Sequence, residues 1–176
     1  MDLQQYLGRK LPCSCGREHE TQLKQVKISS GAVEKLPQIV KKLGHSRVFA
    51  ISDANTRAVL GEKAEAILGE AGLLAGSVTL PGDVLADEEG IGRVLMHFQR
   101  DSDVILAVGT GTLNDIGKLT SWRMGLPYLV AATAPSMDGF VSNVAAMTAD
   151  RMKTTYPAHV PEAVVADLDV LGRVVV

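Results

Sequence analysis

The sequence predicts an α/β domain in which a parallel β-sheet is flanked by helices. Short apolar runs of strand length alternate along the chain with longer patterns of helical periodicity. The spacing between successive runs suits right-handed strand–helix–strand crossovers, which join parallel strands. The apolar content is 46% and the aromatic content only 4%, so aliphatic side chains do most of the packing, as is usual in layered α/β domains.

The first half of the chain contains three expected strands, each followed by a helical pattern. The strands are expected at residues 25–29, 48–51 and 77–80. The helices are expected at residues 32–43, 56–71 and 87–98. Gly44 is a natural C-terminal cap for the first helix, and Asp87 is a natural N-cap for the third.

The second half repeats this alternation around a glycine-rich centre. A buried strand is expected at residues 104–108, a helix from Leu113 to Met124, and another buried strand at 128–132. A turn at 148–151 lies between two short strands, which predicts a β-hairpin near the C-terminus, and residues 163–166 form a further strand. The apolar end, residues 174–176, is either an added strand or the point at which a larger protein was interrupted.

Composition limits the classes of partner. The chain has 176 residues and a net charge of −2, which gives no electrostatic case for binding nucleic acid or an anionic membrane. No apolar run approaches the roughly 20 residues needed to cross a bilayer, and the first ten residues lack the apolar core of a signal peptide. The sequence predicts a cytoplasmic protein, with homo-oligomerisation left open.

Polar residues gather where three of the expected strands end. Asp53 follows one strand, Gly109-Thr110-Gly111 another, and the loop from Thr133 to Ser142 a third. Open parallel sheets bind ligands at the carboxyl ends of their strands, so these residues are expected at one edge. A glycine turn at a helix start favours phosphate, because backbone N–H groups and the helix dipole face the anion. The glycine pattern alone is weak, because Asn114 stands where a dinucleotide fingerprint carries its third glycine.

The two cysteines form a C-S-C-G-R-E-H segment near the start of the chain. A disulfide between Cys13 and Cys15 would be strained across one residue. With His19 they offer three zinc ligands, whereas a structural zinc site normally has four at wider spacing. The segment is therefore interpreted as a plain reduced loop rather than a metal site.

Longer motifs carry a resemblance to a known family. The stretches GTGTLNDIGK (109–118), GLPY (125–128) and TAPSMDGFVS (133–142) resemble the bacterial sn-glycerol-1-phosphate dehydrogenases. These belong to the iron-containing alcohol dehydrogenase and glycerol dehydrogenase superfamily. The similarity extends from Cys13 to Asp169. It implies a Rossmann-like fold, with residues 1–176 as one dinucleotide-binding domain and residues 1–24 as its N-terminal extension.

The resemblance also implies site residues for NAD or NADP and for a polyol phosphate substrate. The positions expected to contact the cofactor are Asp53, Gly109, Gly111, Thr112, Leu113, Asn114, Asp115, Thr133, Ser136 and Ser142. Asp138 matches the residue that holds the substrate hydroxyls, which suits a carboxylate accepting two hydrogen bonds. Other interpretations stay open: Asp53 suits a helix cap, Asp138 an Asp-Gly turn, and Lys118 either a phosphate contact or a solvated helix face.

Similar enzymes continue into a helical C-terminal domain that supplies an aspartate and two histidines to a catalytic divalent metal. None of those positions is present here, so that domain is expected to be absent. Zinc or nickel is therefore expected only in the full-length enzyme, and neither a metal ligand nor a catalytic residue is assigned. The family reduces dihydroxyacetone phosphate to sn-glycerol 1-phosphate with NAD(P)H. The chain alone is expected to be catalytically incomplete, since loss of Lewis-acid polarisation costs several kcal/mol of barrier.

Three alternatives remain. The chain could be the cofactor domain of another superfamily member, such as glycerol dehydrogenase or a dehydroquinate synthase-like enzyme, although the TAPSMDG wording speaks against this. It could be a non-catalytic nucleotide-binding module, which would bind NAD without turnover. It could also be a structural fragment whose exposed apolar face drives self-association.

Overall fold

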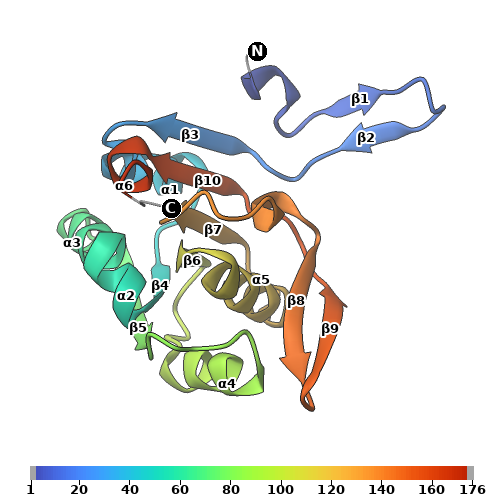
Figure 1. Ribbon diagram of the computed structural model, residues 1–176. Coiled ribbons are helices and arrows are strands. Elements are labelled where there is room, and N and C mark those ends of the chain that lie inside the picture. The colour runs from blue at the N-terminus through green and yellow to red at the C-terminus, as the bar shows by residue number, and fades with distance from the viewer. Residues whose placement is uncertain (1–2, 174–176) are drawn as a thin grey trace.

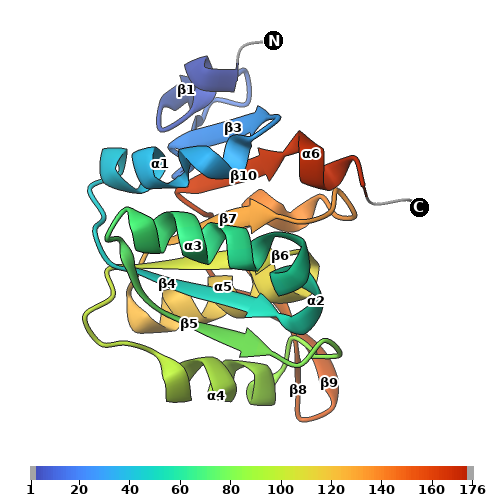
Figure 2. The same cartoon turned by 90° about the vertical axis from the view of Figure 1, so that its left-hand side faces the viewer.

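The computed structural model describes residues 3–173 and shows a six-stranded parallel sheet (Figures 1 and 2). Figure 2 shows the strands stacked from β3 at the top to β5 at the bottom. Across the sheet they are β3 (Gln25–Ser29), β10 (Ala163–Asp167), β7 (Tyr128–Ala132), β6 (Val104–Gly109), β4 (Val48–Asp53) and β5 (Leu74–Leu80). Every neighbouring pair is parallel, so all carboxyl ends lie at one edge.

Helices cover both faces of the sheet, which makes three layers. One face is covered by η2 (Ala32–Lys35), α1 (Leu36–Lys42) and α3 (Glu62–Glu70), and the other by α4 (Glu88–His97) and α5 (Gly111–Met124). The side chains of β6 alternate between the cores on the two faces of the sheet. Val104, Leu106 and Val108 face the first core, whereas Ile105 and Ala107 face the second. A strand buried on both faces needs this continuous apolar run.

The expected helices are present, but two of them begin irregularly. The first opens with the 3-10 turn η2, and Pro37 sits in the first turn of α1. The second comprises α2 (Ala54–Thr56), the π-helical turn η3 (Arg57–Gly61) and α3. The cap predictions are confirmed: Gly44 has a φ of +88°, and the Asp87 Oδ1 accepts a hydrogen bond from the Gly90 backbone N–H at 2.8 Å.

Two antiparallel hairpins flank the sheet. The predicted C-terminal hairpin is formed by β8 (Val144–Ala149) and β9 (Met152–Pro157), and β8 packs against α5. The turn between them places Asp150 and Arg151 at positive φ. A second hairpin, β1 (Lys10–Pro12) and β2 (Glu18–Glu20), was not expected and projects from the body on the amino-terminal side of β3 (Figure 1). Its strands lack an apolar alternation, so sequence pattern offered no signal for it.

The last two short helices are η4 (Gly139–Val141), in the loop before β8, and α6 (Leu168–Leu171), directly after β10. A 3-10 turn, η1 (Leu3–Tyr6), precedes β1. The expectation for residues 174–176 lies outside the described residues. Within the described part of the chain, no helix is both long and apolar enough to span a bilayer.

Candidate functional site

The strand order creates a switch point between β4 and β6. From β4 the chain proceeds outward to β5, whereas from β6 it proceeds the other way to β7. The connections therefore leave in opposite directions from two adjacent carboxyl ends, and ligands of open α/β sheets bind in the crevice that results. Asp53 ends β4 and Gly109 ends β6, so the sequence-predicted residues lie at this point.

The start of α5 has free donors. Thr110 occupies the N-cap position with an extended backbone, and its side chain makes no cap hydrogen bond. The first N–H groups of a helix have no partner within it, and here no cap side chain takes their place. Together with the helix dipole, they favour an anion at this end of the 14-residue helix.

The two glycines of the turn have different constraints. A Cβ on Gly109 would lie 2.6 Å from the Cβ of Leu113, so the fold itself requires glycine there. A Cβ on Gly111 would meet only the Met137 Sδ, at 3.0 Å, which is the end of a flexible side chain. Internal packing therefore accounts for Gly109 fully, whereas at Gly111 only the flexible Met137 side chain would have to move for a ligand to approach the backbone.

The glycine turn and the 133–142 loop lie together, as predicted. The Thr133 backbone N–H donates to the Gly109 carbonyl at 3.1 Å, which joins the ends of β7 and β6. The Met137 side chain lies over Gly111 at the start of α5. Two motifs more than 20 residues apart in sequence thus form a single surface.

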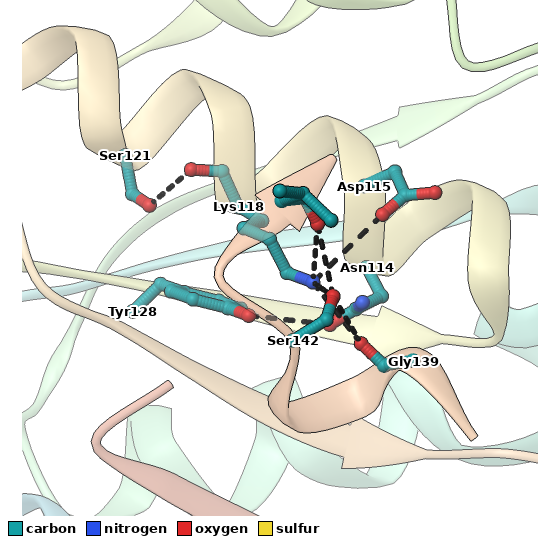
Figure 3. Close-up of polar contacts among 8 residues, drawn as sticks. Asn114, Asp115, Lys118, Ser121, Tyr128, Gly139 and Ser142 are labelled. Carbon is teal, nitrogen blue, oxygen red and sulfur yellow. Dashed lines mark hydrogen bonds and ion pairs between the residues drawn. The ribbon is translucent and has the colours of Figure 1, made fainter. Parts of the chain in front are cut away.

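Lys118 connects the same two motifs from inside the protein (Figure 3). Its side chain has 0% exposure, and its Nζ donates to the Gly139 carbonyl at 3.1 Å, the Ser142 Oγ at 2.8 Å and the Val144 carbonyl at 3.0 Å. The expectation of a solvated helix-face lysine is therefore wrong. Its ammonium has oxygen partners on three sides, and these fasten the loop to α5 rather than leave the charge for a phosphate.

Asp115 lies one turn before Lys118, with its Oδ1 3.9 Å from the Lys118 Nζ. Burial raises the pKa of the Asp115 carboxyl, and the nearby ammonium opposes that rise. Burial likewise lowers the pKa of Lys118, against the attraction of Asp115. The pair is therefore held at a cost in desolvation, which the three oxygen contacts of Lys118 offset.

Asn114 and Leu113 point into the protein. The Asn114 side chain has 1% exposure, and its Oδ1 accepts a hydrogen bond from the Tyr128 hydroxyl at 3.5 Å. Its Nδ2 is buried and has no hydrogen-bond partner among the described residues. Leu113 is 1% exposed within the second core. Their expected cofactor contacts stay predictions, and for Leu113 such a contact can come only from the backbone.

Asp53 has the geometry of a helix cap. Its Oδ1 accepts a hydrogen bond from the Thr56 backbone N–H at 2.7 Å, and the Thr56 Oγ1 in return accepts from the Asp53 backbone N–H at 3.0 Å. This reciprocal capping box confirms the structural interpretation of the S-D-A-N segment. A ribose contact through the same carboxylate stays a prediction.

The remaining predicted residues differ in exposure. Ser136 and Asp138 are exposed on the loop, and Asp138 makes no side-chain cap contact to η4. Thr133 is 5% exposed, and the Ser142 hydroxyl is half-buried against Lys118 and two carbonyls. Of this group, Ser136 and Asp138 are free to meet a ligand as the loop stands, whereas Ser142 holds the loop.

A cavity of about 450 Å³ opens beside the start of α5. Gly111, Thr112 and Asp115 line one side, and the β8–β9 hairpin and the segment after β5 line the others. A larger cavity of about 680 Å³ lies at the amino ends of β3, β7 and β10, next to Trp122 and His159. The smaller cavity lies at the carboxyl edge and shares Gly111 and Thr112 with the glycine turn, but Asp53, Gly109 and the 133–142 loop do not line it.

Sequence reasoning missed two residues that shape this site. Tyr128 is fully buried behind Asn114, and burial raises its pKa well above the ordinary value. Met137 covers Gly111. Tyr128 was recognised as the start of a strand and as the last residue of the GLPY motif, but its contact with Asn114 was not predicted. No periodic signal marks a methionine in a loop as a cover for another motif.

Within residues 3–173, one group of three His, Cys, Asp or Glu side chains could share a metal ion, and it comprises Cys13, Cys15 and His19. It lies on the β1–β2 hairpin, so the carboxyl edge of the sheet has no such ligand set among the described residues. The residues at that edge fit a phosphate-bearing cofactor better than a metal.

Comparison with known proteins adds to this geometry. Residues 27–174 match the iron-containing alcohol dehydrogenase family. The glycerol-1-phosphate dehydrogenase [NAD(P)+] of Halalkalibacterium halodurans is 35% identical over 166 residues, which cover 92% of this chain and 42% of that protein. The protein of the same name from Bacillus subtilis is 35% identical over 153 residues, which cover 85% of this chain and 39% of that protein.

Solved structures are similar at the level of the fold. The glycerol dehydrogenase of Schizosaccharomyces pombe superimposes with a TM-score of 0.74 at 21% identity, covering 86% of this chain and 39% of that one. The maleylacetate reductase of Agrobacterium tumefaciens gives a TM-score of 0.71 at 20% identity, covering 86% and 43%. The chain spans about two-fifths of the length of the relatives it matches.

Proposed function

The chain belongs to the iron-containing alcohol dehydrogenase family, and we propose that it binds NAD or NADP at the switch point between β4 and β6. We further propose that it forms the cofactor-binding part of a glycerol-1-phosphate dehydrogenase, as the names of its relatives suggest. The observation that carries the proposal is the turn Gly109-Thr110-Gly111, which leads from a buried strand into α5 at the switch point.

The residues at this point suit a dinucleotide in three respects. The first turn of α5 offers N–H groups to a pyrophosphate, with no cap side chain competing for them. Gly111 allows close approach of the backbone, since a Cβ there would contact only a flexible methionine. Asp53 sits at the end of the adjacent strand, where a carboxylate can accept hydrogen bonds from ribose hydroxyls.

The bound nicotinamide would supply or accept the hydride. The task of this chain's own residues is to hold the dinucleotide and to orient the substrate beside it. Asp138 is exposed on the loop that Lys118 and Met137 fasten over the start of α5. Its ionised carboxylate can accept hydrogen bonds from two adjacent hydroxyls, which suits a polyol phosphate such as sn-glycerol 1-phosphate.

The described residues offer no metal ligand set beside this loop, so no step through a metal is assigned to them. The proposed reaction is the reversible reduction of dihydroxyacetone phosphate to sn-glycerol 1-phosphate by NAD(P)H. Because the relatives are more than twice as long as the matched segment, turnover is proposed only for a protein that includes their remaining length.

Calorimetric titration of the chain with NADH and with NADPH tests the cofactor proposal. We expect micromolar to millimolar affinity for at least one of them. Gly111→Val should weaken binding by at least tenfold, because the side chain would occupy the space in which the pyrophosphate approaches the backbone. Gly69→Val is the matched control: Gly69 is also a helical glycine, and nothing lies within 4 Å of a Cβ at that position. Equal affinity of wild type and Gly111→Val would remove the glycine turn from the site.

A further inference from the structure

The β1–β2 hairpin carries a group of side chains that the proposed function does not use. Pairing of Leu11 with His19 and of Pro12 with Glu18 closes the hairpin over a five-residue tip, residues 13–17. Within the tip, the Gly16 backbone N–H donates to the Cys13 carbonyl at 3.0 Å, and the Cys13 N–H donates to the Arg17 carbonyl at 3.2 Å. Gly16 has a φ of +80°, which a residue with a side chain rarely adopts.

This tight tip brings both thiols and one imidazole together. The Cys15 Sγ lies 3.1 Å from the His19 Nε2, and the ligand atoms of Cys13, Cys15 and His19 all lie within 4.8 Å of one another. In a tetrahedral zinc site with bonds of about 2.3 Å to sulfur and 2.0 Å to nitrogen, ligand atoms are about 3.5–3.8 Å apart. The three donors, which lie within 4.8 Å of one another, are therefore already near those separations.

We propose that Cys13, Cys15 and His19 bind a thiophilic divalent cation, Zn²⁺, through three protein ligands and one open position. Two thiolates and an imidazole select zinc over the oxygen-preferring magnesium and calcium. Two thiolates also neutralise the charge of the cation. All three ligands are exposed, so a water molecule can take the fourth position.

Two further features favour the site. Both cysteines are free thiols, so both sulfur atoms are available as metal ligands. The two strands of the hairpin also contribute little stability of their own. Its strands are three residues each and mostly exposed, and two-stranded hairpins are only marginally stable in water. A metal clip at the tip would couple ion binding to ordering of the hairpin.

The site is distinct from the proposed cofactor site, which lies at the carboxyl edge of the sheet, whereas the hairpin extends from the amino-terminal side of β3 (Figure 1). The inference therefore does not rest on the dehydrogenase proposal. Zinc binding and cofactor binding can be measured separately on the same chain.

The test uses the reduced, chelator-treated chain. Titration with Co²⁺ should give one equivalent of binding with a thiolate-to-cobalt charge-transfer band, and Zn²⁺ should displace the cobalt. We expect a zinc Kd of about 1 µM or tighter, weaker than four-ligand structural sites because one ligand is missing. Zinc should also slow the reaction of both cysteines with a thiol reagent.

Cys13→Ser, Cys15→Ser and His19→Gln should each weaken zinc binding by at least tenfold. His97→Gln is the matched control, since His97 is an exposed histidine on α4 whose Nδ1 lies 2.9 Å from the Arg93 carbonyl. Circular dichroism would check that each variant keeps its fold, which an exposed hairpin should not endanger. Zinc binding of wild-type strength in the Cys13→Ser/Cys15→Ser double variant, or the absence of thiolate–cobalt absorption in the wild type, would overturn the proposal.

Discussion

Replacement of the buried lysine by a residue of similar length but no charge is the sharpest test of how the site is held. Lys118→Met keeps most of the apolar stem and removes the ammonium that bridges Gly139, Ser142 and Val144. The Ser142 hydroxyl lies 3.0 Å from the Gly139 carbonyl and 2.9 Å from the Val144 carbonyl, but it has one hydrogen to donate. The Gly139 carbonyl also accepts a hydrogen bond from the Ser142 backbone N–H at 3.2 Å, so the hydroxyl can turn to the Val144 carbonyl and each carbonyl keeps one donor.

The magnitude follows from these contacts. Hydrogen bonds to a charged donor are worth about 1.5–3 kcal/mol each before desolvation is subtracted. Breaking a buried ion pair costs about 3–5 kcal/mol. Asp115 keeps 19% side-chain exposure, however, so water can partly solvate its charge once Lys118 is gone. Relief of lysine desolvation reduces the loss further. We expect a net destabilisation of about 2–3 kcal/mol, or roughly 4–12 °C in Tm.

Urea unfolding followed by circular dichroism measures this loss, and chymotryptic cleavage at Phe140, within the fastened loop, reports the local effect. Lys63→Met is the control, because the Lys63 ion pair with Glu34 is exposed and should contribute less than about 0.5 kcal/mol. If Lys118→Met unfolds at the same urea concentration as wild type and Phe140 is cleaved no faster, then the lysine does not hold the loop. If Lys118→Met is less stable but Phe140 is cleaved no faster, then Lys118 stabilises the core rather than the loop.

Two other predictions concern the 133–142 loop and His159, which lines the cavity of about 680 Å³. Asp138→Asn should weaken binding of sn-glycerol 1-phosphate to the NAD-loaded protein about tenfold, or roughly 1.4 kcal/mol, with unchanged cofactor affinity. If calorimetry shows a loss of NAD binding instead, then Asp138 contacts the cofactor and its assignment to the substrate is wrong. The His159 ring stacks on the Tyr128 ring with 5.4 Å between the ring centroids. Burial lowers the pKa of His159 below the ordinary value of 6.5. As the pH falls, His159 is therefore protonated in the unfolded state before it is protonated in the folded state. The free energy of unfolding should decline as the pH falls below 6.5. Denaturant midpoints at pH 7.5 and 5.5 should differ less in His159→Gln than in wild type, and equal differences would contradict the assignment.

The strands of the sheet were predictable because each combines an apolar run with a turn residue at its end. β3 and β7 have the expected bounds, and β6 differs only by including Gly109. Grouping of Asp53, Gly111 and the 133–142 loop at one edge followed from the rule for parallel sheets, which needs no knowledge of strand order. The structure confirms that placement.

The environment of Lys118 was not predictable from its own position. A lysine on a helix is ordinarily solvated, and its three acceptors come from a loop 21–26 residues further along the chain. The sequence offered Cys13, Cys15 and His19 as three possible zinc ligands, but a plain loop was preferred for a related reason. Their spacing suggested a loop, and only the pairing of β1 with β2 turns the histidine back toward the thiols. In both cases the contacts depend on long-range or cross-strand geometry, which the local sequence pattern does not indicate.

The place of β10 in the sheet has a consequence for how the protein is made. Among the described strands, β3 pairs with β10, whose residues lie 138 positions later in the chain, and β10 in turn covers the edge of β7. At a synthesis rate of about 5–20 residues per second, the ribosome adds the intervening residues in roughly 7–28 seconds. For that time β3 lacks its partner. The fully buried strand β7 ends at Ala132, 31 residues before Ala163, so at the same rate its apolar edge stays unpaired for roughly 2–6 seconds, and such an edge readily pairs with the wrong chain. Pairing of β10 with β7 ends this interval, so the apolar edge of β7 is covered only by a strand that is made later in the chain.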